Sequence, residues 1–228
     1  PGLILDSRSS QVNDLCFKKT PLYVFRWLMD NNIVLSQKNI DSLIVKNRVD
    51  VIRNGFHYQS FLKTIFNRFH LASGTDIFGL SQNTSPMITA IKYDRVEIVK
   101  LLLESSSYGN PYIDQIDSIF LETIKYIHRG ILSYLIVNHY ERIKSLLDRK
   151  FSTIISRFDN IEDILFYIVI NKKANVTRDI IKTLISKNYV ELFKYCFKKY
   201  NFNKFKNNSD LIAKCLEKNR FIIFDYLM

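Results

Sequence analysis

One pattern of apolar and polar residues occurs four times along this chain. The copies begin at Leu43, Ala90, Leu184 and Cys215 and read LIVKNRVDVIR, AIKYDRVEIVK, LISKNYVELFK and CLEKNRFIIFD. In each copy an apolar start is followed by a polar pair, Lys-Asn or Tyr-Asp, and then by apolar residues at helical spacing. The pattern predicts two antiparallel helices joined by a short turn. Such a pair cannot bury its apolar faces alone, so the chain is constrained to stack several pairs.

Weaker copies of the second helix follow Tyr23, Gly130 and Asn160. The positions equivalent to Ile98 are Val24, Val51, Ile98, Ile131, Ile164, Leu192 and Ile223. They are separated by 27, 47, 33, 33, 28 and 31 residues. The value of 47 predicts an inserted loop around residues 70–83, HLASGTDIFGLSQN, which has no helical period. We therefore expect an N-terminal segment or cap over residues 1–20 and a repeat array over residues 21–228.

Composition supports an all-α chain. Only six Gly and four Pro occur in 228 residues, and 47% of the residues are hydrophobic, which favours long helical tracts with an ample core. The longest apolar runs, which begin at Ile131 and Ile164, are far shorter than the roughly 20 residues of a membrane helix. The N-terminus lacks the basic start and apolar body of a signal peptide. We expect a protein without a membrane span, located inside cells in the cytoplasm.

The clearest copy, SPMITAIKYDRVEIVKLLL from Ser85, resembles the ankyrin repeat. That family has a Thr-Pro-Leu-His start, a Gly-His turn and a Glu-Ile-Val second helix. Ser85, Pro86, Met87 and Ala90 stand at the corresponding positions of the start, and Asp94-Arg95 stands at the turn. The resemblance implies an ankyrin-like helical solenoid of about six to seven degenerate helix-turn-helix repeats,. It implies neither a cofactor nor chemistry.

Most copies depart from the family at the turn, where its glycine is replaced. The residues that stand in place of this glycine are Asn47, Asp94, Asn188 and Asn219. These residues tolerate the left-handed backbone that Gly adopts, so we expect the turn to survive. The connecting loops are irregular, and we expect the strands of the family's β-hairpin fingers to be short or missing. Degenerate arrays rich in Asn, Ile and Lys resemble those of large DNA viruses, intracellular pathogens and parasites.

The resemblance implies a non-enzymatic adaptor that holds a protein partner on its concave face or loop tips. If the chain comes from a virus or a pathogen, the resemblance implies that the partner is a host protein. The net charge of +11 favours an acidic partner. The same charge leaves open a basic protein that binds RNA or ribonucleoprotein. A third interpretation is a substrate-recruiting segment of a larger enzyme or of a ubiquitin-ligase adaptor.

Signals of chemistry are weak. The four histidines are dispersed, and the three cysteines have no CxxC spacing, so we predict no catalytic residue, no metal site and no cofactor. The acidic residues Asp159, Glu162 and Asp163 follow or flank Asn160, an arrangement typical of a helix cap with acids at the positive end.

Two segments are candidates for partner contact. In FKKYNFNKFKNN, from Phe197 to Asn208, basic residues alternate with aromatic ones, a pattern that can bind phosphates and stack bases. The alternative is that the aromatic rings pack under the helices and the lysines stay in water. The candidate residues here are Lys198, Lys199, Tyr200, Lys204 and Lys206.

The second candidate lies in the inserted loop, where Ile77, Phe78 and Leu80 are apolar in a turn-like segment. They are either an exposed anchor for a partner or a lid packed on the array. Near the N-terminus, Tyr23, Phe25 and Trp27 have helical core spacing, and we expect all three in the core.

Overall fold

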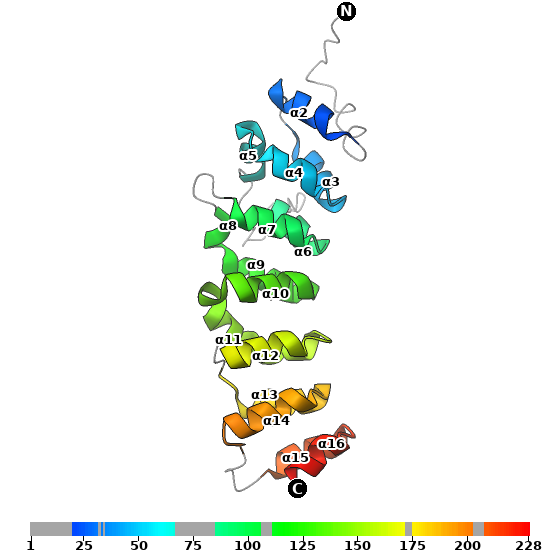
Figure 1. The fold of residues 1–228 in the computed structure, drawn as a ribbon, viewed down its shortest axis with the longest axis vertical. Coiled ribbons are helices and arrows are strands. Elements are labelled where there is room, and N and C mark those ends of the chain that lie inside the picture. The colour runs from blue at the N-terminus through cyan, green and yellow to red at the C-terminus, as the bar shows by residue number, and fades with distance from the viewer. Residues whose placement is uncertain are drawn as a thin grey trace, which may run out of the picture. The chain divides into compact units, whose positions relative to one another are not determined.

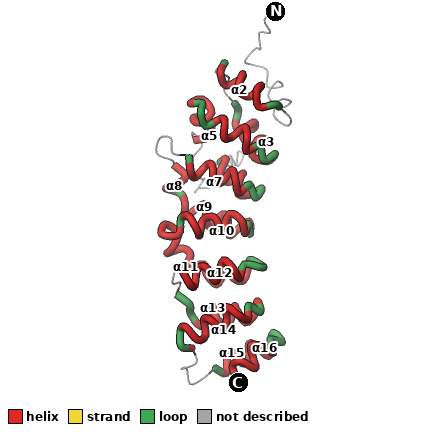
Figure 2. Tube along the Cα trace, in the orientation of Figure 1, coloured by secondary structure: helices red, strands yellow, loops and turns green. Residues whose placement is uncertain are grey.

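The computed structural model describes residues 20–66 except 32 and 34, together with residues 85–105, 111–171, 175–202 and 208–228. Over these residues the chain is all-α and contains no strand (Figures 1 and 2), which confirms the expected class. The inserted loop at 70–83 and most of the segment 1–20 lie outside the described residues. The chain divides into two compact units, unit 1 from Pro1 to Tyr134 and unit 2 from Leu135 to Met228.

Unit 1 arranges its helices in two rows. The helices are α2 (Leu22–Asp30), α3 (Gln37–Val45), α4 (Val49–Gly55), α5 (Gln59–Phe66), α6 (Pro86–Lys92), α7 (Val96–Glu104), α8 (Pro111–Asp114), α9 (Ile116–Tyr126) and the start of α10 (Arg129–Asn138). In one row α3 packs on α6 and α6 on α9, and in the other α2 packs on α4 and α4 on α7. The rows join because α3 packs on α4 and α6 on α7 (Figure 1).

Unit 2 repeats this arrangement. After the end of α10 it contains α11 (Tyr140–Arg157), α12 (Glu162–Asn171), α13 (Arg178–Lys187), α14 (Val190–Lys199), α15 (Ser209–Glu217) and α16 (Phe221–Leu227). One row runs α11, α13, α15 and the other runs α12, α14, α16, with each helix packed on the next. Each helical pair therefore buries its apolar faces against its neighbours, as the repeated pattern predicts.

The core follows the predicted period. Of the seven positions equivalent to Ile98, Val24 is half-buried and the other six are buried: Val51, Ile98, Ile131, Ile164, Leu192 and Ile223. The start of the clearest copy also has the expected form. Ser85 is the N-cap of α6, its hydroxyl accepts a hydrogen bond from the Ile88 N–H, and Pro86 follows at the first helical position, where a missing N–H costs nothing.

Two expectations about side chains and caps are wrong. In α2, Phe25 is buried with its ring edge-on to Phe61, but Tyr23 is 73% exposed and Trp27 is 51% exposed. The reason is helical geometry, because Phe25 and Met29 share one face and Tyr23 and Trp27 lie on the opposite one. Asn160 is not the N-cap of α12, since the helix begins at Glu162 and Asn160 occupies a left-handed turn position.

Candidate interaction surfaces

The turn between the two helices of each pair has a fixed backbone signature. Seven described non-glycine residues have positive φ, and six of them lie four residues before a core position of the repeat: Asn47, Asp94, Ile127, Asn160, Asn188 and Asn219. Their φ angles lie between 52° and 61°. The four turn positions expected to be left-handed are confirmed, and the sequence spacing of the turns matches that of the core positions.

Arginines that follow the left-handed residue tie one pair to the preceding pair. Arg95 Nη2 donates a hydrogen bond of 2.6 Å to the carbonyl of Val45, the last residue of α3. Arg220 Nη2 donates one of 3.0 Å to the carbonyl of Ser186 near the end of α13. Carbonyls in the last turn of a helix have no partner within the helix. The arginine of one pair therefore caps the first helix of the pair before it.

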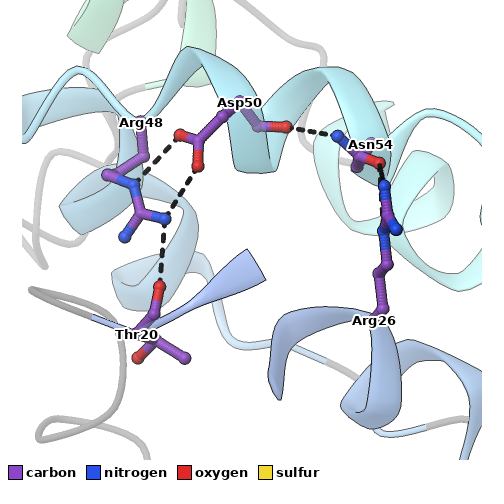
Figure 3. Close-up of polar contacts among 5 residues, drawn as sticks. All are labelled: Thr20, Arg26, Arg48, Asp50 and Asn54. Carbon is purple, nitrogen blue, oxygen red and sulfur yellow. Dashed lines mark hydrogen bonds and ion pairs between the residues drawn. The ribbon is translucent and has the colours of Figure 1, made fainter. Parts of the chain in front are cut away.

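Arg48, which also follows a left-handed turn residue, makes a backbone contact and an ion pair (Figure 3). Arg48 donates a hydrogen bond of 3.0 Å to the Thr20 carbonyl. It also donates hydrogen bonds to both carboxylate oxygens of Asp50. The hydrogen bonds from Arg48 hold the pKa of Asp50 below its usual value. On the same side, Arg26 of α2 donates to Asn54 Oδ1 of α4 at 2.8 Å. Both contacts join residues that are 28 apart in sequence.

Unit 2 has its own ties at related separations. Lys187 pairs with Asp159 at 2.8 Å, and the Leu192 N–H at the start of α14 donates to Glu162 Oε1. Lys199 donates to the Val169 carbonyl near the end of α12. In the next pair Asp210 of α15 accepts from Arg178 and Lys182 of α13, at 2.5 and 2.9 Å. These hydrogen bonds, with the one from Arg178 the largest cause, hold the pKa of Asp210 far below its usual value.

In unit 1 the turns of consecutive pairs follow one another along one edge (Figure 2). Their exposed residues are Lys46, Asn47, Tyr93, Asp94 and Ile127, and we call this set the turn surface of unit 1. Its members are held in place, since Arg95 binds the pair before it and His128 Nδ1 lies 3.6 Å from Asp94 Oδ1. The surface combines a fixed backbone with two large exposed apolar side chains, Tyr93 and Ile127.

Ile127 is the unusual member of this surface. Its φ and ψ are 61° and 42°, a left-handed conformation at the end of α9, and its side chain is 45% exposed. A β-branched residue is strained there, whereas Asn and Asp are tolerated. The five equivalent described turns all carry Asn or Asp. Residues in strained conformations of this kind cluster at functional sites in proteins.

The predicted basic and aromatic segment is only partly described. Lys198 is exposed at the end of α14 and Tyr200 is half-buried. Lys199 is exposed in part but is engaged, because it caps α12 through Val169 and its ammonium lies 5.2 Å from the centre of the Tyr195 ring. Lys204 and Lys206 lie outside the described residues, as do Ile77, Phe78 and Leu80. The sequence predicts Lys199 as a partner-contact residue. In the structure its ammonium contacts α12 and the Tyr195 ring.

The aromatic residues of this segment pack inward where they are described. Phe197 and Phe202 are buried, and their rings stack 6.3 Å apart. This supports the interpretation in which the rings lie under the helices and the lysines remain in water. For Phe197 and Phe202 the aromatic pattern thus indicates core residues, and Phe205 lies outside the described residues.

The positive charge is unevenly divided. Unit 2 contains 18 Lys and Arg against 10 Asp and Glu, an excess of 8, and unit 1 contains 15 against 12, an excess of 3. Several of the described lysines of unit 2 are bound to carboxylates: Lys182, Lys187, Lys194, Lys214 and Lys218. The long-range field of unit 2 is positive, although these five lysines are locally paired.

Neither a metal cluster nor a membrane span is found in the part of the chain that the structure describes. No group of three or more His, Cys, Asp or Glu side chains there could hold a metal ion. None of its helices combines the length and apolar character needed to cross a bilayer. The described cysteines, Cys196 and Cys215, are buried free thiols, and burial raises the pKa of Cys196 to about 12.

Comparison with protein-family models, with curated proteins and with solved structures found no match to this chain.

Proposed function

We propose that this chain is a non-enzymatic protein–protein interaction module built as a solenoid of six to seven degenerate ankyrin-like repeats. Its packing supports this proposal. Side-chain contacts between successive pairs join residues 28 to 34 apart, as in Arg26–Asn54, Asp159–Lys187 and Ser186–Arg220. Across the predicted insertion the separation rises to 48 for Asp41–Thr89 and 50 for Val45–Arg95. A translational repeat creates an extended binding surface.

The observation that carries the proposal is Ile127 on the turn surface of unit 1. A strained and exposed isoleucine on the same turn surface as exposed Tyr93 is costly for a chain that only needs to fold, because Asn would relieve the strain and expose less apolar surface,. Both side chains are large enough to fill a pocket on a partner. Arg95 ties the turn of Tyr93 to the pair before it, and His128, next to Ile127, lies 3.6 Å from Asp94. Such anchors dominate binding energy at protein interfaces.

The excess of basic residues in unit 2 favours an acidic partner. A positive field raises the rate of encounter with a negatively charged protein and contributes less to the final affinity. We propose that the chain is an adaptor encoded by a virus or a pathogen. It would capture an acidic host protein in the cytoplasm.

The alternative is a basic protein that binds RNA. The positive excess of unit 2 favours it. Single-stranded RNA is bound by unpaired cations and by aromatic rings open to the bases. Phe197 and Phe202 are buried, and five described lysines of unit 2 are paired with carboxylates. These observations favour a protein partner.

A capture experiment with matched variants tests the proposal. The tagged chain, its Ile127→Asn variant and its Ile170→Asn variant are used to retrieve partners from a lysate treated with nuclease. Ile170 is a suitable control because it is also an exposed isoleucine at 45%, but belongs to α12 of unit 2 and not to the turn surface of unit 1. Partners should be lost with Ile127→Asn and kept with Ile170→Asn.

Stability separates loss of binding from loss of folding. Ile127→Asn should raise the free energy of unfolding by about 1 kcal/mol because it relieves the left-handed strain. A variant that is more stable and yet retrieves less partner would support a functional role for the strained residue. Retention of every partner by Ile127→Asn, or a pull-down that nuclease empties, would rule the proposal out in favour of RNA or of another surface.

A further inference from the structure

Helix α11 is longer than its place in the repeat requires. The first helices of the other described pairs, α3, α6, α9, α13 and α15, have 7 to 11 residues, whereas α11 has 18. Helices α13 and α15 begin 14 residues before their core positions Leu192 and Ile223, but α11 begins 24 residues before Ile164. Its additional turns, residues 140–149, follow α10 after the single residue His139. The connection between these two pairs is therefore helical, and the side chains on it have a fixed backbone.

Outside α11, most described cations of unit 2 are engaged. Those that bind carboxylates or backbone carbonyls are Arg178, Lys182, Lys187, Lys194, Lys214, Lys218, Lys199 and Arg220. Helix α11 carries five further cations, all of them exposed: Arg142, Lys144, Arg149, Lys150 and Arg157. Lys144, Arg149 and Lys150 form no ion pair with any described residue, and Arg149 donates only to the Ser145 carbonyl of the same helix. The uncommitted positive charge of unit 2 is therefore concentrated on α11.

Four of these five cations lie on one side of the helix. We call them the basic face of α11: Arg142, Arg149, Lys150 and Arg157. The two arginines are seven residues apart and share one stripe, and the other two cations lie about a quarter turn beyond it. The acids Glu141 and Asp148 each precede one of the arginines, so they lie about a quarter turn to the other side. The basic face is thus free of acids and is about 22 Å long, at about 1.5 Å per residue.

The basic face begins beside a hollow. This open hollow has a volume of about 240 Å³ and is lined by residues 137–142, so Arg142 borders both features. Val137 at the end of α10 is 50% exposed there and offers an apolar contact. The hollow can receive an apolar side chain, and the planar guanidinium groups next to it can bind carboxylates with two hydrogen bonds each. An apolar anchor point with a charged rim is the usual arrangement of a protein interface.

We propose that the basic face of α11 and the hollow beside it bind an acidic segment of a partner protein. An apolar residue of the segment enters the hollow, and its carboxylates contact Arg142 and Arg149. This inference rests on the protein–protein function proposed above and assigns the acidic partner to a surface, since opposite charges select this occupant. Single-stranded RNA needs aromatic rings open to its bases, and the two aromatic residues of α11, Tyr140 and Phe151, are buried.

Peptides selected on the full chain test this inference. A display library of random peptides of about twelve residues is panned on the wild-type chain at about 0.15 M salt, near physiological ionic strength. The affinity of the recovered peptides is then measured by fluorescence anisotropy for wild type, Arg149→Glu, Val137→Ser and Lys218→Glu. Lys218→Glu is the matched control, because Lys218 is an exposed cation at the end of α15 and its substitution changes the charge of unit 2 equally. Circular dichroism shows whether each variant retains its helix content.

The recovered peptides should be acidic and should contain an apolar residue. Arg149→Glu and Val137→Ser should each weaken their binding about tenfold or more, and Lys218→Glu should change it less than about twofold. A library that yields no binder, peptides without an acidic excess, or equal losses with Arg149→Glu and Lys218→Glu would overturn the proposal. An oligouridylate of similar charge that binds as tightly as the peptides would overturn it in favour of RNA. Ile127→Asn should bind the peptides like wild type, because Ile127 belongs to unit 1, so failure here is distinct from failure of the turn surface.

Discussion

The guanidinium of Arg95 donates a hydrogen bond to the backbone carbonyl of Val45, fifty residues earlier in the chain. The contact joins the turn of one helical pair to the end of the first helix of the pair before it. It bridges the interval that contains the predicted insertion, so it holds two adjacent pairs in register whatever lies between them. Arg220 makes the equivalent contact to Ser186 in unit 2, which indicates that the tie is a property of the repeat.

Removing this tie should destabilise unit 1. Arg95→Ala leaves the Val45 carbonyl without its charged donor, and we expect the free energy of unfolding to fall by about 1–2 kcal/mol. Urea unfolding followed by the fluorescence of Trp27, the single tryptophan and a residue of unit 1, measures the change. Arg53→Ala is the control, because Arg53 is exposed on α4 and should cost less than about 0.5 kcal/mol. Equal effects of the two substitutions would contradict the role of Arg95.

The left-handed turns should discriminate sharply between substitutions. Asn188 has φ 60° at the end of α13, a conformation that costs most L-residues about 1 kcal/mol or more. Asn188→Ala should therefore lower the free energy of unfolding by about 1 kcal/mol, whereas Asn188→Gly should be neutral or slightly stabilising. Thermal unfolding monitored by circular dichroism distinguishes the two. If Ala and Gly were equally tolerated, the backbone would not be constrained at this turn.

Much of the fold follows from periodicity alone. The core positions from Val51 to Ile223 and the turn residue Asn188 are predictable, since helical spacing and left-handed tolerance are local properties of a few residues. The helices α5 and α11 are harder to predict. The 18-residue helix α11 buries seven side chains, but its frequent Lys, Arg and Ser residues conceal the apolar stripe.

The candidate surfaces are less accessible to sequence reasoning. Lys199 looks free in the sequence and is bound to Val169, a partner 30 residues away. Trp27 has core spacing, yet it lies on the face of α2 opposite the buried Phe25 and is exposed,. Ile127 carried one usable signal, its position four residues before Ile131, where other copies have Asn or Asp. Exposure and backbone strain depend on the packing of neighbouring pairs, so composition cannot reveal them.

The stability of unit 2 should depend on the charge of Asp210. Its folded pKa lies below the ordinary value of 3.8 because Arg178 and Lys182 bind the carboxylate. A depressed folded pKa means that the stabilisation is complete above the unfolded pKa and is lost as the pH falls below about 4. Asp210→Asn should remove this part of the acid sensitivity and make the stability curve flatter between about pH 4 and pH 2.

At neutral pH the cost of Asp210→Asn should be at most about 1 kcal/mol, because the carboxylate is partly exposed and screened. High salt should reduce the difference from wild type. Asp148→Asn provides the comparison, since Asp148 is an exposed residue in the middle of α11 and its loss should change stability by less than about 0.5 kcal/mol. If the free energy of unfolding fell equally for wild type and Asp210→Asn as the pH is lowered, Asp210 would not stabilise unit 2 through its ion pairs.

The buried thiols should report opening of the last helical pairs. Cys196 and Cys215 are buried, and burial raises the pKa of both, that of Cys196 to about 12. In a Cys16→Ser background, where these are the two remaining thiols, a thiol reagent at pH 8 should label the native chain about 100-fold or more slowly than the unfolded chain. Labelling should accelerate in low urea, before Trp27 fluorescence changes, if unit 2 opens separately from unit 1. Immediate labelling of both thiols in the native chain would contradict the packing of α13 on α15 and of α14 on α16 described above.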